Sequence, residues 1–158
     1  MLINPNLLDI TKTTHTNASY DFNTKIVRVV GNYHASRVQY KLPDDLVVGQ
    51  EYTFSCNINN IDGNNLLTTR AYPGESEIKE LKSDGSRQSF TFKLNDKNTH
   101  IYLYLGINSK TYGSYKIYNE KLENGKKDTI YVPYKQSLET AKRQYFIGGG
   151  TFKEVYPL

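Results

Sequence analysis

The sequence predicts an all-β fold, an antiparallel sandwich of two sheets of the jelly-roll type. Apolar and polar residues alternate with period two in several short segments, which is typical of half-buried strands. Turn-forming pairs such as Pro73-Gly74, Asp84-Gly85 and Asn124-Gly125 separate these segments. About eight short strands at near-regular spacing favour two packed antiparallel sheets over any helical architecture.

Period-two alternation locates most of the expected strands, and turn residues bound the others. In chain order, strands are expected within 27–29, 38–40, 52–58, 66–72, 89–94, 100–108, 114–118 and 129–132. The apolar faces of these segments define a core, which should include Phe54, Cys56, Phe90, Phe92, Ile101, Leu103, Leu105 and Ile117.

The C-terminal residues depart from this pattern. Leu138, Ala141 and Tyr145 recur at helical spacing behind Ser137, which predicts a short helix, and a run of three glycines follows at 148–150. We therefore divide the chain into a jelly-roll domain, residues 1–135, and an appendage of short helix, glycine run and extended tail, residues 136–158. The tail is too apolar to stay free, so we expect it either to contact a partner subunit, as in a homo-oligomer, or to fold back on the sandwich.

Charge and hydropathy exclude two classes of partner. The net charge of the 158 residues is +4, but the basic residues are scattered among acidic ones, so the sequence predicts solvated surface charge and no nucleic-acid interface. No apolar run approaches the ~20 residues of a membrane span. Met1 is followed by neither a basic segment nor an apolar one, so we expect no signal peptide and synthesis in a cytoplasm.

No catalytic or zinc motif is found. The one cysteine, Cys56, alternates with core residues, and the three histidines are isolated from one another. Carboxylates such as Asp44, Glu51, Glu75 and Glu120 could meet in space, but no spacing pairs them for acid–base chemistry. The chain is therefore predicted to be no enzyme.

No cofactor is predicted, although calcium is left open by one loop. Five oxygen-bearing side chains surround Gly63, but the EF-hand spacing is not met, and turn formation accounts for them. These residues are Asn59, Asn60, Asp62, Asn64 and Asn65.

The segment from His100 to Asn108 predicts a binding face. Its apolar residues share one face of a strand, whereas His100, Tyr102, Tyr104 and Asn108 share the other, with no lysine or glutamate among them. Tyrosines there can stack on a ligand and still offer a hydroxyl group. A pyranose presents a C–H face to such rings and hydroxyls to polar neighbours, so we predict a shallow saccharide site.

The 66–72 strand could extend this site. It puts Arg70 and Tyr72 on one face, and we expect both to line the saccharide site with the residues of the 100–108 strand. The sequence does not tell whether the two strands are neighbours.

Three segments, in their order along the chain, resemble a family. They are Asn4-Pro5-Asn6-Leu7-Leu8, the strand Gly49-Gln50-Glu51-Tyr52-Thr53-Phe54-Ser55, and a closing segment at 116–133 that contains Lys121-Leu122-Glu123, Gly125, Thr129, Tyr131 and Pro133. This pattern is similar to jelly-roll modules of carbohydrate-binding type in tail and baseplate proteins of phages that infect Gram-positive bacteria. The resemblance implies a virion component that adheres to host cell-wall polysaccharide beside other tail proteins.

Two functions follow as hypotheses. The first is a non-catalytic saccharide-binding module of a phage tail or baseplate. The alternative is a purely structural tail or baseplate assembly protein, in which Tyr102 and Tyr104 would be buried against another subunit. Sequence does not name the sugar.

Overall fold

The computed structural model describes residues 4–29, 36–62, 69–73, 79–105, 113–129 and 131, and for 69–73 it describes the backbone alone. Within this part of the chain, ten strands and one 3-10 turn, η1 (Ile10–Lys12), follow one another. The strands are β1 (Thr13–Thr16), β2 (Ala18–Asp21), β3 (Ile26–Val29), β4 (Arg37–Lys41), β5 (Glu51–Asn60), β6 (Thr69–Pro73), β7 (Lys79–Leu81), β8 (Asp84–Lys93), β9 (His100–Tyr104) and β10 (Ser114–Asn124).

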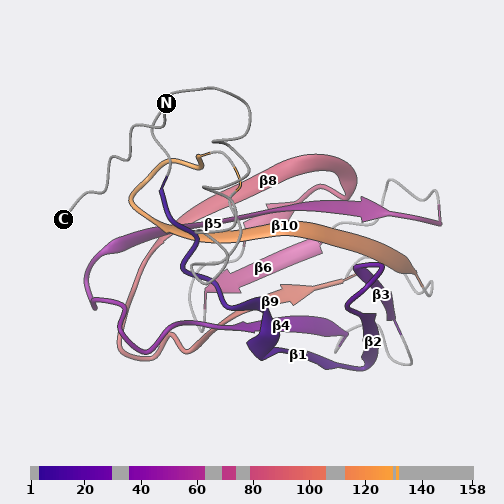
Figure 1. Cartoon of the computed structure of the whole chain (residues 1–158), viewed down its shortest axis with the longest axis horizontal. Helices are drawn as coiled ribbons and strands as arrows, with labels where there is room; N and C mark the ends of the chain where they lie inside the picture. The colour runs from indigo at the N-terminus through magenta and orange to yellow at the C-terminus, as the bar shows by residue number, and fades with distance from the viewer. Residues whose placement is uncertain are drawn as a thin grey trace, which may run out of the picture.

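These strands form two five-stranded antiparallel sheets that pack face to face (Figure 1). The A sheet has the order β1-β4-β9-β6-β7, and the B sheet has the order β2-β3-β10-β5-β8. The predicted all-β jelly-roll sandwich is thus confirmed. Three strands were not predicted, β1, β2 and β7, because each is only three or four residues long, which is too short for alternation to identify a strand reliably.

The core lies between the sheets and is aromatic at its centre. Phe54 of β5 packs against Tyr40 of β4 across the sandwich, with ring centroids 5.4 Å apart, and against Phe90 of β8 at 5.6 Å. All eight residues predicted for the core are buried. Cys56 is one of them, and burial raises the pKa of its thiol, so it is a packing residue with little thiolate character.

The N-terminal segment is held to the B sheet by the buried amide side chain of Asn6, together with a backbone hydrogen bond from Leu7 N–H to the Leu122 carbonyl oxygen at 2.8 Å. Asn6 is 1% exposed, and its Oδ1 accepts hydrogen bonds from the backbone N–H groups of Leu8 and Leu122, both at 3.0 Å. Its Nδ2 donates to the carbonyl oxygen of Glu120 at 2.9 Å. β10 needs these partners because its pairing with β5 is irregular between Tyr118 and Lys121.

The segment after β10 folds back over the outer face of the B sheet, where it buries an ion pair. The Lys121 Nζ lies 3.2 Å from the Glu123 carboxylate, and both side chains have no exposed area. Thr129 donates its N–H and hydroxyl to the two carboxylate oxygens of Glu123, at 2.8 and 2.6 Å, and accepts from the Lys121 ammonium. Burial lowers the pKa of Lys121, and the Glu123 carboxylate opposes this shift.

A second ionic contact fixes the same segment. The Arg87 guanidinium of β8 binds both oxygens of Asp128, with Nε–Oδ2 and Nη2–Oδ1 distances of 2.9 and 3.2 Å.

The prediction of a strand at 129–132 is wrong for the residues that the structure describes. Thr129 and Tyr131 lie outside any strand, because Thr129 satisfies the carboxylate of Glu123 and joins no ladder.

Several predictions fall outside the described residues, namely the C-terminal helix, the glycine run and the apolar tail of 136–158.

In the loop considered for calcium, the Asn60 Oδ1 accepts from the backbone N–H of Asp62 at 2.9 Å, which is a turn contact. Within the described ranges, no three metal-ligating side chains gather, and no helix has the length and hydropathy of a membrane span.

Candidate functional site

The outward face of the A sheet carries the side chains that the sequence predicts for binding. β9 buries Ile101 and Leu103 in the core and leaves His100, Tyr102 and Tyr104 half-buried on the other side. Neighbouring β4 shows the same alternation, with Val38 and Tyr40 buried. Its outward positions are Arg37, Gln39 and Lys41, which pair in register with Tyr104, Tyr102 and His100 respectively.

Three rings form a row along β9. The His100 and Tyr102 ring centroids are 5.8 Å apart, and those of Tyr102 and Tyr104 are 6.5 Å apart. The interplanar angles are 32° and 40°, so the rings tilt moderately relative to one another. Side chains at alternate positions of one strand repeat every ~6.6–6.8 Å, which sets this spacing. The three half-buried rings therefore follow one another along the outward side of β9.

Arg37 lies against two of these rings. Its Cζ atom is 5.4 Å from the centroid of Tyr102 and 5.6 Å from that of Tyr104, which are cation–π distances. The Nη1 donates to the Tyr104 hydroxyl at 3.1 Å. The Nε is buried and has no hydrogen-bond partner among the described residues. Within this part of the chain, the guanidinium is thus oriented by the rings and not by a carboxylate.

Polar groups continue the face on the β4 side of the row. The Gln39 Nε2 donates to the Thr16 hydroxyl of β1 at 2.7 Å. Lys41 forms an exposed ion pair with Asp44 at 3.2 Å. Burial, and secondarily the positive charge of Lys41, lower the pKa of His100, which favours a neutral imidazole at pH 7. Its Nδ1 lies 2.9 Å from the Thr99 hydroxyl.

β6 pairs with the opposite edge of β9. The register sets Arg70 opposite Tyr104, and Tyr72 opposite Tyr102. The strand predicted over 66–72 is thus a neighbour of the tyrosine strand, which the sequence left open. The role of Arg70 and Tyr72 in binding stays a prediction, and Asn108 lies outside the described residues.

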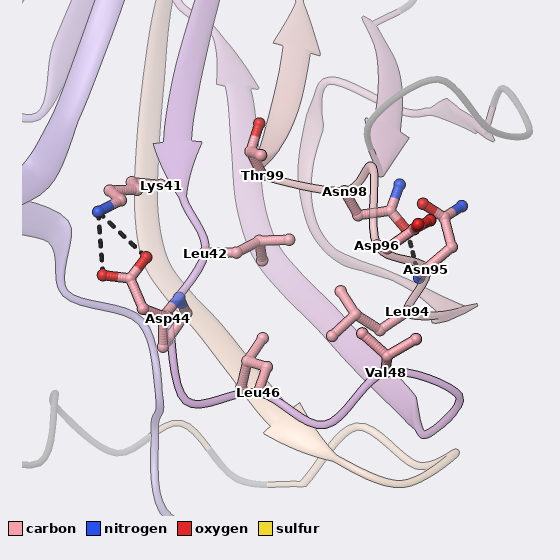
Figure 2. Close-up of a pocket in the computed structure, with 11 residues that line it drawn as sticks. Lys41, Leu42, Asp44, Leu46, Val48, Leu94, Asn95, Asp96, Asn98 and Thr99 are labelled. Atoms are coloured by element: carbon pink, nitrogen blue, oxygen red, sulfur yellow. Dashed lines mark hydrogen bonds and ion pairs between the residues drawn. The ribbon is translucent and has the colours of Figure 1, made fainter.

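A separate pocket of about 250 Å³ opens at one end of the sandwich, between the β4–β5 and β8–β9 loops (Figure 2). Its walls combine five apolar side chains with a polar rim. The lining consists of Leu42, Pro43, Leu46, Val48, Leu94, Lys41, Asp44, Asn95, Asp96, Asn98 and Thr99. None of these described residues is aromatic. The side-chain oxygens of Asn95 and Asn98 accept turn hydrogen bonds from Lys97 and Asn95 N–H groups, both at 2.9 Å, so they hold the loop.

The contribution of β4 to this face was not predicted from the sequence. Arg37, Gln39 and Lys41 alternate with Val38 and Tyr40, so their outward direction was readable from the pattern. Their position beside β9 was not, because it depends on a pairing between strands about sixty residues apart in sequence. The cation on the tyrosine rings could not be found without that pairing.

No protein-family model matches the chain, and no curated protein matches its sequence. Among solved structures, the chain is similar to the CBM22-1 xylan-binding domain of Xyn10C from Paenibacillus barcinonensis, with a TM-score of 0.49 and 10% identity over 80% of this chain and 95% of that one. It is also similar to a family 29 carbohydrate-binding module from Piromyces equi, with a TM-score of 0.46 and 11% identity over 75% and 84%. At such identities the likeness is one of fold.

Proposed function

We propose that the chain is a non-catalytic saccharide-binding module whose ligand lies across the outward face of β4 and β9. The observation that carries the proposal is the row of His100, Tyr102 and Tyr104, half-buried in register with the polar side chains of β4. A solvated strand face ordinarily carries charged or small polar residues, since apolar ring surface gains nothing from contact with water. Rings in such positions favour a partner with an apolar face of its own.

A sugar chain has the chemistry that such a face can recognise. Pyranose C–H faces pack on aromatic rings, and ring hydroxyls exchange hydrogen bonds with amide, imidazole and phenol groups. The amide of Gln39, the neutral imidazole of His100 and the Tyr104 hydroxyl provide such groups beside the rings. Each hydroxyl must give up water for a protein partner at a small net gain, so a single module should bind weakly.

Replacement of both tyrosines tests the site. Tyr102→Ala with Tyr104→Ala should lower saccharide affinity by about a hundredfold, because each lost ring removes on the order of 1.5 kcal/mol. The measurement is a glycan array that includes Gram-positive cell-wall polysaccharides, followed by calorimetry on the saccharides retained. The melting temperature should stay within a few degrees, since both side chains lie outside the core.

Tyr118→Ala is the matched control, because Tyr118 is also half-buried but lies on the outer face of the B sheet, opposite Asn57. It should leave binding unchanged. A well-folded double variant that keeps full affinity would move the site elsewhere on the molecule. A wild-type chain that binds no saccharide in any assay would instead favour the structural alternative, in which this face contacts another subunit.

We further propose a place for the module in the tail or baseplate of a phage, where it would adhere to the host cell wall. This proposal is supported by the resemblance of the three sequence segments given above. Two of them meet in the fold, because Asn6 of the opening segment bonds the backbone of β10 around Lys121-Leu122-Glu123 of the closing segment. In a virion, several copies would add avidity to weak single sites. Binding of the isolated chain to intact cell walls tests this setting.

A further inference from the structure

We infer that this face prefers an acidic saccharide, one that carries carboxylate or phosphate groups, and that Arg37 determines the preference. The inference rests on the proposed function and names the class of its ligand. Arg37 belongs to β4, at the register position opposite Tyr104. It therefore lies between the β1 and β9 side chains, at the end of the strands that Tyr104 marks, beside the tyrosine rings on which a ligand would stack.

The charge of Arg37 is not compensated by any carboxylate among the described residues. Its hydrogen-bond partner is the neutral Tyr104 hydroxyl. Asp44, the nearest acidic residue along the chain, is paired with Lys41 at 3.2 Å. On β7, Glu80 occupies the register position opposite Arg70, at the far edge of the A sheet. Among the described residues, Arg37 therefore leaves an unpaired positive charge beside the tyrosine rings.

The guanidinium also has an unused hydrogen-bonding capacity. The Nε–H is buried without an acceptor in the part of the chain that the structure describes, which ordinarily costs about 1–3 kcal/mol. Natural proteins keep such groups rare, so each one needs an explanation. An anionic group bound at the other nitrogens of the guanidinium would pair its positive charge. Because the Tyr102 and Tyr104 rings hold the guanidinium in place, little side-chain entropy would be lost on binding.

Arginine held in this way suits planar anionic groups. A guanidinium offers parallel N–H donors that match the two oxygens of a carboxylate or a phosphate, and such charge-assisted bonds are about twice as strong as neutral ones. A neutral sugar hydroxyl would meet the same donors but would leave the positive charge unpaired. The preference should therefore appear as a difference between acidic and neutral forms of one polymer.

Calorimetry with two matched pairs of polymers tests the inference. The first pair is polygalacturonate and its fully methyl-esterified form. The second pair is phosphomannan and the same mannan after removal of its phosphate. At low ionic strength, the wild-type chain should bind the acidic member of at least one pair about tenfold more tightly than its neutral form, and added salt should reduce the difference. The pair that shows the preference identifies the anionic group as carboxylate or phosphate.

Three variants assign the preference to Arg37. Arg37→Gln should remove it, with about a tenfold or greater loss of affinity for the acidic polymer and little change for the neutral one. Arg37→Lys should keep part of it, because the charge remains but the parallel donors are lost. Arg28→Gln is the matched control, since Arg28 is exposed on β3 of the B sheet, and it should change nothing.

The ratio of acidic to neutral affinity separates this role from a purely structural one, which would weaken both members of a pair equally. An equal ratio in wild type, or an unchanged ratio in a folded Arg37→Gln variant, overturns the inference while the saccharide site stands. If no polymer or array glycan binds the wild-type chain, the proposed function fails as well.

Discussion

Glu123→Ala should destabilise the protein by about 3–5 kcal/mol, because it leaves the Lys121 ammonium buried without its counter-ion. The same change removes the acceptors of the Thr129 N–H and hydroxyl, which hold the segment after β10 against the B sheet. The melting temperature should fall by about 10 °C or more for a chain of this length. Urea unfolding followed by circular dichroism measures the loss.

The double variant Lys121→Met with Glu123→Leu provides the control. Replacing both members of a buried ion pair with apolar residues of similar volume is often neutral for stability, so the double variant should be clearly more stable than Glu123→Ala. A loss below about 1 kcal/mol in Glu123→Ala would mean that the two charges are hydrated in solution and that the segment after β10 does not cover them as described.

Asn6→Ala should cost about 3 kcal/mol, which is the second-largest effect expected on stability. The amide makes three hydrogen bonds to backbone groups of Leu8, Glu120 and Leu122, and each buried group left without its partner costs about 1 kcal/mol or more. Thermal and urea unfolding measure the change.

Asn4→Ala is the matched control in the same segment. The Asn4 amide makes one long, exposed contact with the Asn124 carbonyl oxygen at 3.4 Å, so its loss should stay within about 0.5 kcal/mol. Equal effects of the two substitutions would contradict the assignment of Asn6 as the residue that joins the N-terminal segment to β10.

Alternation along the chain predicted the fold class and the core, for a physical reason. Successive side chains of a strand point to opposite faces, so the buried set can be read from one strand without knowing its neighbours. Phe54, Phe90 and Ile101 were assigned to the core in this way, and all three are buried. The same rule gave the outward direction of Tyr102 and Tyr104.

What alternation could not give was the pairing of strands and the burial of charge. Arg37 joins the site because β4 pairs with β9, and nothing within either segment specifies that register. Lys121 and Glu123 belong to the closing segment that the resemblance singled out, yet a lysine and a glutamate ordinarily lie at the surface. Their burial depends on the chain folding back over the B sheet, which no local pattern predicts.

The central claim is that the face of β4 and β9 binds saccharide, and nuclear magnetic resonance tests it most directly. The ¹⁵N-labelled chain is titrated with the tightest-binding oligosaccharide from the array. Amide shifts should change along Arg37–Lys41 and His100–Tyr104 and remain constant at Leu46, Val48 and Asn98, which line the pocket at the end of the sandwich. Shifts confined to that pocket, or to the outer face of the B sheet, would contradict the claim.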